Sequence, residues 1–222
     1  WNLPDQTGLV TLPGSGSQPV ALEFSRDSTR LAVVYDEGIV LVWDWREQTV
    51  VTVPGAPDET VGKINQLRFS PDGQYLVGTT FNTGVVWNAQ DGTLLHTLSL
   101  ENGGSSYVFK FSPQNTYVVT GGLTPDAALW NVTSGNLIAA LPGVGGSTTI
   151  DASFAPTGDL MFTSELSGEV VLWNLANLAN GTIARSSQPI ANEHIVNVLW
   201  TDDAFQVLLI DSRGPIEVWG IP

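Results

Sequence analysis

The sequence predicts an all-β fold built from five copies of one unit. Two markers support this prediction because both recur in one phase. The first is an aromatic residue followed by a small residue and a turn, as in FSPDG at 69–73, and its aromatic stands at positions 24, 69, 111, 154 and 200. The second is Trp followed by Asp, Asn or Gly, at positions 1, 43, 87, 130, 173 and 219. The five distances from the aromatic to the next Trp are 19, 18, 19, 19 and 19 residues. A fixed period of this kind is typical of an array.

Each period contains four short strands separated by turns, as residues 64–98 illustrate. The first strand is expected over 64–69, where apolar residues recur before the SPDG turn, whose proline presets φ. Further strands are expected over 74–80, 85–87 and 93–98, each bounded by Asn, Asp or Gly. No helical periodicity of useful length interrupts them, so the unit is all-β.

Four strands in each period of 40–45 residues, with Trp-Asp closing the third, resemble the WD-repeat β-propeller. The pairing of FSPDG with WD or WN carries this resemblance across the whole chain. It implies four-stranded antiparallel blades in which the repeat tryptophans are structural residues, at Trp43, Trp87, Trp130, Trp173 and Trp219. The sequence departs from the family in its Gly-His pair, for which His194 is the single candidate. It is therefore a divergent member, whose Asp–His–Ser/Thr–Trp network we expect to be incomplete.

The resemblance implies one propeller domain over residues 1–222, with repeats at 2–43, 44–87, 88–130, 131–173 and 174–219. In this family each repeat supplies the outer strand of one blade and the three inner strands of the next. Residues 7–12 are then an outer strand, and residues 194–219 are three inner strands that lack one. Pairing the two would close a five-bladed ring and cover two sheet edges. The alternative is that the five repeats belong to a longer array.

Composition excludes several classes of partner. The 222 residues carry a formal charge of −14, with 42% apolar residues and no cysteine. We therefore expect no nucleic acid as a partner, because no basic stripe is present to displace phosphate counterions. No apolar run reaches the length of a transmembrane helix, so we expect no membrane insertion. The cellular compartment stays open, as does fusion to domains or repeats upstream of Trp1.

No combination of residues predicts catalysis, a metal or a cofactor. His96 and His194 fall in different repeats, and no nucleophile elbow, phosphate-binding loop or metal motif is present. His96 is expected on an outer strand, in solvent. Five-bladed propellers include glycosidases, which makes Glu23 and Asp151 a candidate acid and base pair. Charges paired between blades are the preferred interpretation of both. The glycosylation sequon at Asn131 overlaps a WN turn, and a second stands at residue 180.

The predicted function is a non-catalytic platform for protein–protein interaction. The alternatives are a carbohydrate-binding or carbohydrate-active propeller and a purely structural module of a larger chain. Because a fold does not establish a function, the prediction depends on the resemblance and on the lack of a catalytic set.

The resemblance also predicts which face binds a partner. Loops between the second and third strands, and between the outer strand and the next inner strand, gather on one face in this family. Here they carry many carboxylates and two cations, which favours a partner with a basic surface: Asp36, Glu37, Asp58, Glu59, Glu101, Asp126, Glu165, Glu169, Glu193, Asp211, Lys63 and Arg213. Trp45, outside the repeat positions, is a further candidate, although packing against a neighbouring turn is the preferred interpretation. The alternative is a protein that is acidic on every face.

Overall fold

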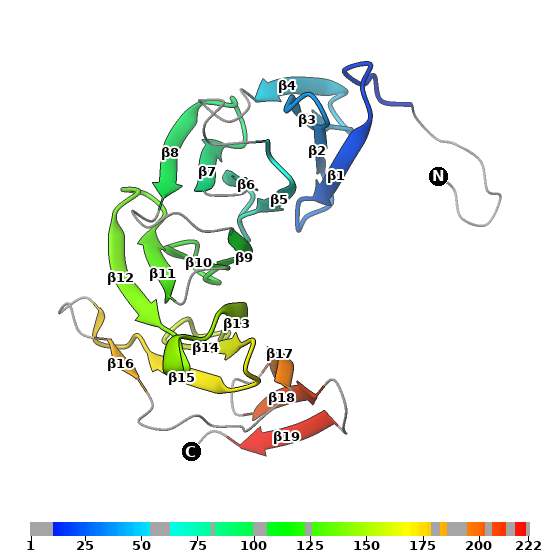
Figure 1. Cartoon of the computed structure of the whole chain (residues 1–222). Helices are drawn as coiled ribbons and strands as arrows, with labels where there is room; N and C mark the ends of the chain where they lie inside the picture. The colour runs from blue at the N-terminus through cyan, green and yellow to red at the C-terminus, as the bar shows by residue number, and fades with distance from the viewer. Residues whose placement is uncertain are drawn as a thin grey trace.

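The described part of the chain contains five antiparallel sheets. The computed structural model describes residues 11–53, 63–80, 83–99, 106–122, 126–178, 183–185, 195–202, 206–211 and 216–220. We number the sheets 1 to 5 in chain order, and their strands are labelled in Figure 1. In sheets 1 to 4 four strands follow one another in space in sequence order, and three strands do so in sheet 5.

The strands have the following bounds. Sheet 1 comprises β1 (Pro19–Phe24), β2 (Arg30–Tyr35), β3 (Val40–Asp44) and β4 (Thr49–Val53). Sheet 2 comprises β5 (Gln66–Phe69), β6 (Tyr75–Thr79), β7 (Thr83–Asn88) and β8 (Leu94–Ser99). Sheet 3 comprises β9 (Ser106–Phe111), β10 (Tyr117–Gly122), β11 (Asp126–Asn131) and β12 (Leu137–Pro142), followed by a 3₁₀ turn, η2 (Val144–Gly146). Sheet 4 comprises β13 (Thr149–Phe154), β14 (Leu160–Glu165), β15 (Val170–Asn174) and β16 (Ala184–Arg185). Sheet 5 comprises β17 (Ile195–Trp200), β18 (Gln206–Asp211) and β19 (Ile216–Gly220).

The predicted all-β fold and its antiparallel sheets are confirmed. The four strands expected between residues 64 and 98 correspond to β5–β8, with boundaries that differ by one or two residues. The predicted repeat boundaries at Trp43, Trp87, Trp130 and Trp173 fall inside sheets rather than between them. In each case the strand that follows the Trp pairs with the strand that contains it, as β4 does with β3.

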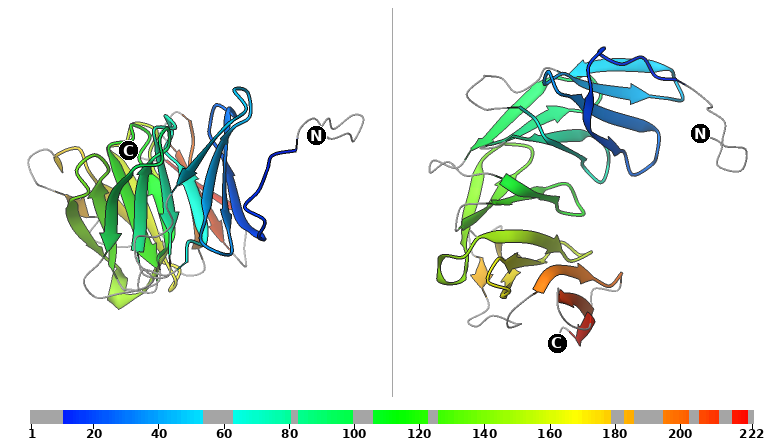
Figure 2. Two further views of the ribbon diagram at one scale, coloured as in Figure 1. Left: turned by 90° about the horizontal axis from the view of Figure 1, so that it is seen from above. Right: turned by 45° about the vertical axis from the view of Figure 1, so that its right-hand side comes forward.

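The sheets follow one another around an open arc, with their innermost strands on the concave side (Figures 1 and 2). Neighbouring sheets contact each other through these inner strands: β1 with β5, β9 with β13, and β13 with β17. Sheets 1 and 5 form the two ends of the arc.

Apolar clusters between successive sheets form the core. Between sheets 1 and 2, Val34 and Val42 pack with Leu67 and Trp87. Equivalent clusters join sheet 2 to sheet 3, sheet 3 to sheet 4 and sheet 4 to sheet 5. Because each strand alternates its side chains between the two faces, one face of a sheet packs on the preceding sheet and the other on the following sheet.

Local hydrogen bonds explain why the first marker contains a serine. Ser70 Oγ accepts the backbone N–H of Tyr75 at 2.9 Å and donates to Asp72 Oδ1 at 2.6 Å. Ser25 and Ser112 accept the N–H five residues on in the same way. The last position of the turn has a positive φ, which is +71° at Gly73. Glycine adopts this conformation without steric cost, so the turn residues of the marker are locally determined.

The second marker ends the third strand with an Asx turn. The Oδ1 atom of Asn88 accepts the backbone N–H of Gln90 at 2.8 Å, and that of Asp44 accepts the N–H groups of Arg46 and Glu47 at 3.0 Å. An Asp or Asn side chain that accepts the backbone N–H two residues on mimics a backbone turn. The WD and WN pairs therefore place a core tryptophan directly before a turn.

The tryptophans of sheets 3 and 4 are anchored by hydrogen bonds as well as by packing. Trp130 Nε1–H donates to Thr120 Oγ1 at 2.9 Å, and Trp173 Nε1–H donates to Thr163 Oγ1 at 3.0 Å. In sheet 2 the position of the threonine is taken by Gly78, and the buried Nε1 of Trp87 has no hydrogen-bond partner among the described residues. In sheet 2 the hydrogen bond between the tryptophan and the second strand is therefore missing among the described residues.

The outer faces of the two end sheets are apolar. On sheet 1, the first end face consists of residues that point away from sheet 2: Leu22, Phe24, Leu31, Val33, Leu41 and Trp43. On sheet 5, the fifth end face consists of residues that point away from sheet 4: Leu199, Leu208, Ile210, Ile216 and Val218. Leu12 packs against the first end face.

The predicted ring closure is not shown by the described residues. Residues 7–10 of the expected outer strand lie outside the described part, and Thr11 and Leu12 are not in a strand. The described strands of sheet 5 end with β19, which pairs only with β18.

Candidate protein-interaction face

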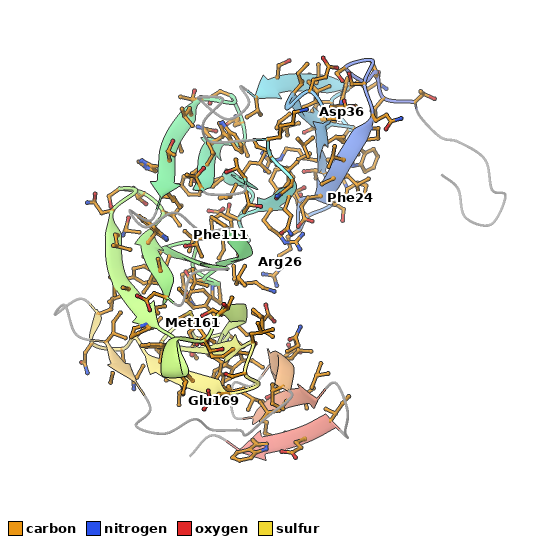
Figure 3. All side chains as sticks on the ribbon, viewed as in Figure 1. Phe24, Arg26, Asp36, Phe111, Met161 and Glu169 are labelled. Carbon is orange, nitrogen blue, oxygen red and sulfur yellow. The ribbon has the colours of Figure 1, made fainter. Side chains whose placement is uncertain are left out.

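The acidic turns between second and third strands lie at one end of the sheets. Asp36 and Glu37 form the exposed turn between β2 and β3, which the Gly38 N–H closes by donating to the Tyr35 carbonyl at 2.8 Å. Glu169 ends the equivalent turn of sheet 4, where it accepts the Ser167 hydroxyl at 2.9 Å. Because the sheets repeat the same strand order around the arc, these turns share one face, which we call the acidic face. Figure 3 labels Asp36 on sheet 1 and Glu169 on sheet 4.

Two further residues predicted for the acidic face, Asp126 and Glu165, differ in exposure to solvent. Asp126 begins β11 and is exposed. Glu165 also ends a second strand, but it is fully buried, and its carboxylate accepts the Thr149 hydroxyl at 3.3 Å. The Glu165 carboxylate is therefore part of the protein interior beneath the turn and is not accessible to a partner.

The acidic face carries one described cation that contacts it. Lys63 Nζ donates to the backbone carbonyl of Asp36 at 2.7 Å, so it ties the start of sheet 2 to the β2–β3 turn of sheet 1. Asp36 and Glu37 form no ion pair with any described residue. Both carboxylates thus keep their charge exposed to solvent.

Trp45 lies at the opposite end of β3 from Asp36, so the structure separates it from the acidic face. Its indole Nε1–H donates to the Ser28 carbonyl at 2.7 Å, and the Arg46 guanidinium lies 5.4 Å from the ring centroid. The side chain packs against a neighbouring turn, as the sequence interpretation preferred.

Several sequence-predicted site residues are not placed. Asp58, Glu59, Glu101, Glu193 and Arg213 lie outside the described residues, as does the side chain of Asp211.

Each of the two carboxylates that the sequence offers for acid and base chemistry is paired with a cation. Glu23 Oε2 of β1 lies 2.8 Å from Arg68 Nη1 of β5, and Asp151 Oδ1 of β13 lies 3.2 Å from Lys110 Nζ of β9. The preferred interpretation, charges paired between neighbouring sheets, is what the structure contains.

His96 and Asn131 have structural contacts. His96 Nε2 lies 2.9 Å from the Thr133 carbonyl in the turn of the next sheet, so the partly exposed imidazole also donates a hydrogen bond across sheets, which the sequence did not predict. Asn131 Oδ1 accepts the Ser134 N–H at 2.9 Å, which is the Asx contact of the WN turn. His194 and the sequon at residue 180 lie outside the described part.

At the end of the sheets opposite the acidic face, two carboxyl groups have lowered pKa values. The Ser25 hydroxyl, together with the N–H and hydroxyl of Thr29, lowers the pKa of Asp27 to about 2. The backbone N–H and hydroxyl of Thr93 lower the pKa of Asp91. Hydrogen bonds to the ionised carboxylate favour it, so both groups hold their turns in the charged form.

The described residues contain no group of three or more His, Asp or Glu side chains arranged to hold a metal ion. In the same part of the chain, no helix has the length and apolar character needed to cross a membrane. Comparison with protein-family models and with curated proteins finds no match to this sequence.

Sequence reasoning missed the gathering of basic side chains on the concave side of the arc. Arg68 and Lys110 directly precede the marker aromatics Phe69 and Phe111, and Arg26 lies in the turn after β1. The sequence signal that could have revealed this gathering is the position of these residues directly before, or two residues after, a marker aromatic. Such residues of neighbouring repeats lie close together because the first strands of the sheets are the inner strands of the arc.

Proposed function

We propose that the chain is a divergent WD-type β-propeller that acts as a non-catalytic platform, binding the basic surface of another protein through its acidic face. The observation that carries this proposal is the exposed turn of Asp36 and Glu37, which is held by backbone hydrogen bonds and leaves both carboxylates without an ion pair among the described residues.

The architecture supports such a role in two ways. Closely packed sheets hold the turns in fixed positions, so a partner does not need to order them when it binds. Exposed carboxylates that gather on one face create a negative potential, and such a potential speeds encounter with a cationic partner.

The test is the association rate of a basic probe. We would measure binding of a fluorescein-labelled octalysine peptide by stopped-flow fluorescence at low and high salt. Neutralising four carboxylates of the acidic face should lower the association rate at least tenfold at low salt, in the combined variant Asp36→Asn, Glu37→Gln, Asp126→Asn and Glu169→Gln. High salt should largely remove the difference, because it screens exposed charges.

The matched control neutralises four exposed carboxylates at the other end of the sheets: Glu47→Gln, Asp72→Asn, Asp91→Asn and Asp202→Asn. These changes remove the same net charge. If the control slows association as much as the acidic-face variant does, binding follows total charge and the acidic face is not the site.

We further propose that the propeller closes into a five-bladed ring, with residues 7–12 as the outer strand of sheet 5 and the two end faces in contact. Leu12 supports closure because of where it packs. Leu98 and Leu141, from the outer strands of sheets 2 and 3, pack in clusters with the sheet that follows each of them. Leu12 packs on sheet 1 in the same way, as an outer strand preceding sheet 1 should.

Deletion of residues 1–13 tests closure. It should uncover the edge of β19 and part of the first end face, which promotes aggregation and lowers the melting temperature by ten degrees or more. Removal of Ile221 and Pro222 is the control and should leave the melting temperature within about one degree. A soluble monomer of unchanged stability after the N-terminal deletion would show that the ring does not close through these residues.

A further inference from the structure

Two adjoining hollows lie on the concave side of the arc, near the turns that join first to second strands. Their volumes are about 300 Å³ and about 270 Å³. Both are lined by residues of the turns after β1 and β5 and of the inner strands, and the second also by Pro113 in the turn after β9. The two share Arg26, Pro71, Lys110 and Phe111. Figure 3 shows Arg26 in the middle of the arc, beside Phe111. We call the two together the inner hollow.

The inner hollow is positively charged in a strongly acidic protein. Its charged lining consists of three cations, Arg26, Arg68 and Lys110, and two carboxylates, Glu23 and Asp151. Three of the eight Lys and Arg residues of the chain thus meet in one place, with a local charge of +1 against −14 for the whole sequence. This distribution favours an anionic ligand here, on the face opposite the acidic turns.

The carboxylates hold two of the cations in place without using all of their donors. Arg68 donates to Glu23 and to the Leu67 carbonyl through Nη1, and neither of these hydrogen bonds uses Nη2 or Nε. Lys110 has three N–H donors, and one carboxylate lies within reach at 3.2 Å. Both side chains remain about half exposed. An anion can therefore bind to side chains that are already oriented.

Arg26 has no ion pair or hydrogen bond with any described residue, and its side chain is exposed. It comes from sheet 1, whereas Lys110 comes from sheet 3, and both line each hollow. A ligand held by both would therefore span the concave side of the arc.

The apolar lining selects against a simple inorganic anion. The half-buried Phe111 and Pro71 contribute to both hollows, and the buried Phe69 and Phe154 form apolar walls of the first and the second. Apolar side chains of a ligand would remove such aromatic and proline surface from water, which is favourable, while the cations would bind its carboxylates. We infer that the inner hollow binds an acidic peptide segment in which carboxylates alternate with apolar side chains.

Fluorescence anisotropy with a labelled probe tests this inference. The probe is a fluorescein-labelled hexapeptide of alternating Glu and Leu, and a hexapeptide of alternating Gln and Leu is its uncharged counterpart. The acidic probe should bind saturably at low salt, at least tenfold more tightly than its counterpart. Arg26→Gln should weaken binding at least threefold, and Arg26→Gln with Lys110→Gln at least tenfold.

The matched control is Arg46→Gln with Lys63→Gln, which removes two exposed cations far from the inner hollow. It should change the affinity less than twofold. Arg26→Gln alone keeps the test valid if loss of the Lys110–Asp151 pair perturbs folding, because Arg26 has no ion pair or hydrogen bond with a described residue.

Three outcomes would overturn the inference. They are the absence of saturable binding, an equal loss of affinity in the control variant, and displacement of the probe by pyrophosphate at a concentration equal to that of unlabelled peptide. The last would show that the cations bind small anions without the apolar contacts. None of these outcomes bears on the acidic face, whose test uses a cationic probe and different variants.

Discussion

The interfaces between sheets and the two end faces are built from the same repeat positions, yet several of these positions differ sharply in burial. On the first end face Val33, Leu41 and Trp43 are buried, but the residues of β1 are exposed. Phe69, on the face of sheet 2 that meets sheet 1, is 8% exposed, whereas Phe24 at the same position of sheet 1 is 54% exposed. Val42, which faces sheet 2, is 2% exposed, whereas Val218 at the same position of sheet 5 is 59% exposed. The pattern in the sequence is therefore that of an interface at every sheet, including the two sheets that have a neighbour on one side only.

This difference shows that alternation of apolar residues specifies both faces of each sheet but does not supply the partner. An exposed apolar face of this kind marks a contact that is still to be made. In the proposed ring, each end face has the other as its partner. The first end face corresponds to the face by which sheets 2 to 5 pack on the preceding sheet, and the fifth end face corresponds to the face by which sheets 1 to 4 pack on the following sheet.

The largest expected effect comes from matched truncations in the two regions. Leu67→Ala at an inner interface should cost about 2–5 kcal/mol of unfolding free energy, because it removes buried methyl groups and leaves a cavity. Leu22→Ala, at the same repeat position on the first end face, should cost about 2 kcal/mol if the ring is closed. Urea denaturation monitored by tryptophan fluorescence measures both values. A change below about 0.5 kcal/mol for Leu22→Ala, the behaviour of an exposed site, would mean that the end face stays open.

A smaller effect separates hydrogen bonding from packing within the inner interfaces. Thr120→Val and Thr163→Val keep the side-chain shape but leave a buried indole N–H unsatisfied, which should cost about 1–3 kcal/mol each. Trp87 shows that one such unsatisfied group is tolerated. Gly78→Thr would not restore the bond in sheet 2, because a Cβ there would lie 2.6 Å from the Trp87 ring, so this variant should also be destabilised. If Gly78→Thr were stabilising, packing at Trp87 would be looser than at the other interfaces.

The smallest effect is a pH dependence in the turn of sheet 1. The folded-state pKa of Asp27 is lowered to about 2, so the charged carboxylate stabilises the fold fully above the unfolded pKa of about 4. That stability is lost as the pH falls from about 4 to about 2. Asp27→Asn should therefore lower the melting temperature by a few degrees at pH 7, and the difference from the original protein should shrink near pH 2. A difference that stays constant over this range would assign the effect to something other than ionisation of Asp27.

The positions of strands and turns could be predicted because they depend on short-range patterns. The Ser70–Tyr75 and Asn88–Gln90 contacts join residues at most five positions apart. The acidic face could be predicted in part, since the Asp36–Glu37 turn is set by its own backbone hydrogen bonds. The burial of Glu165 could not, because it depends on Thr149, which precedes it by 16 residues on a paired strand.

The sequence by itself determined the all-β repeat, the turn chemistry of both markers and the apolar alternation of every sheet, all of which follow from neighbours along the chain. The tertiary structure alone decided which charges meet: Glu23 finds Arg68 from 45 residues away, and Arg26 joins Lys110 at the inner hollow. It also decided that Trp45 lies at the other end of β3 from Asp36. Such contacts depend on how sheets stack around the arc, and side chains distant in the sequence meet only after that packing has brought the inner strands together.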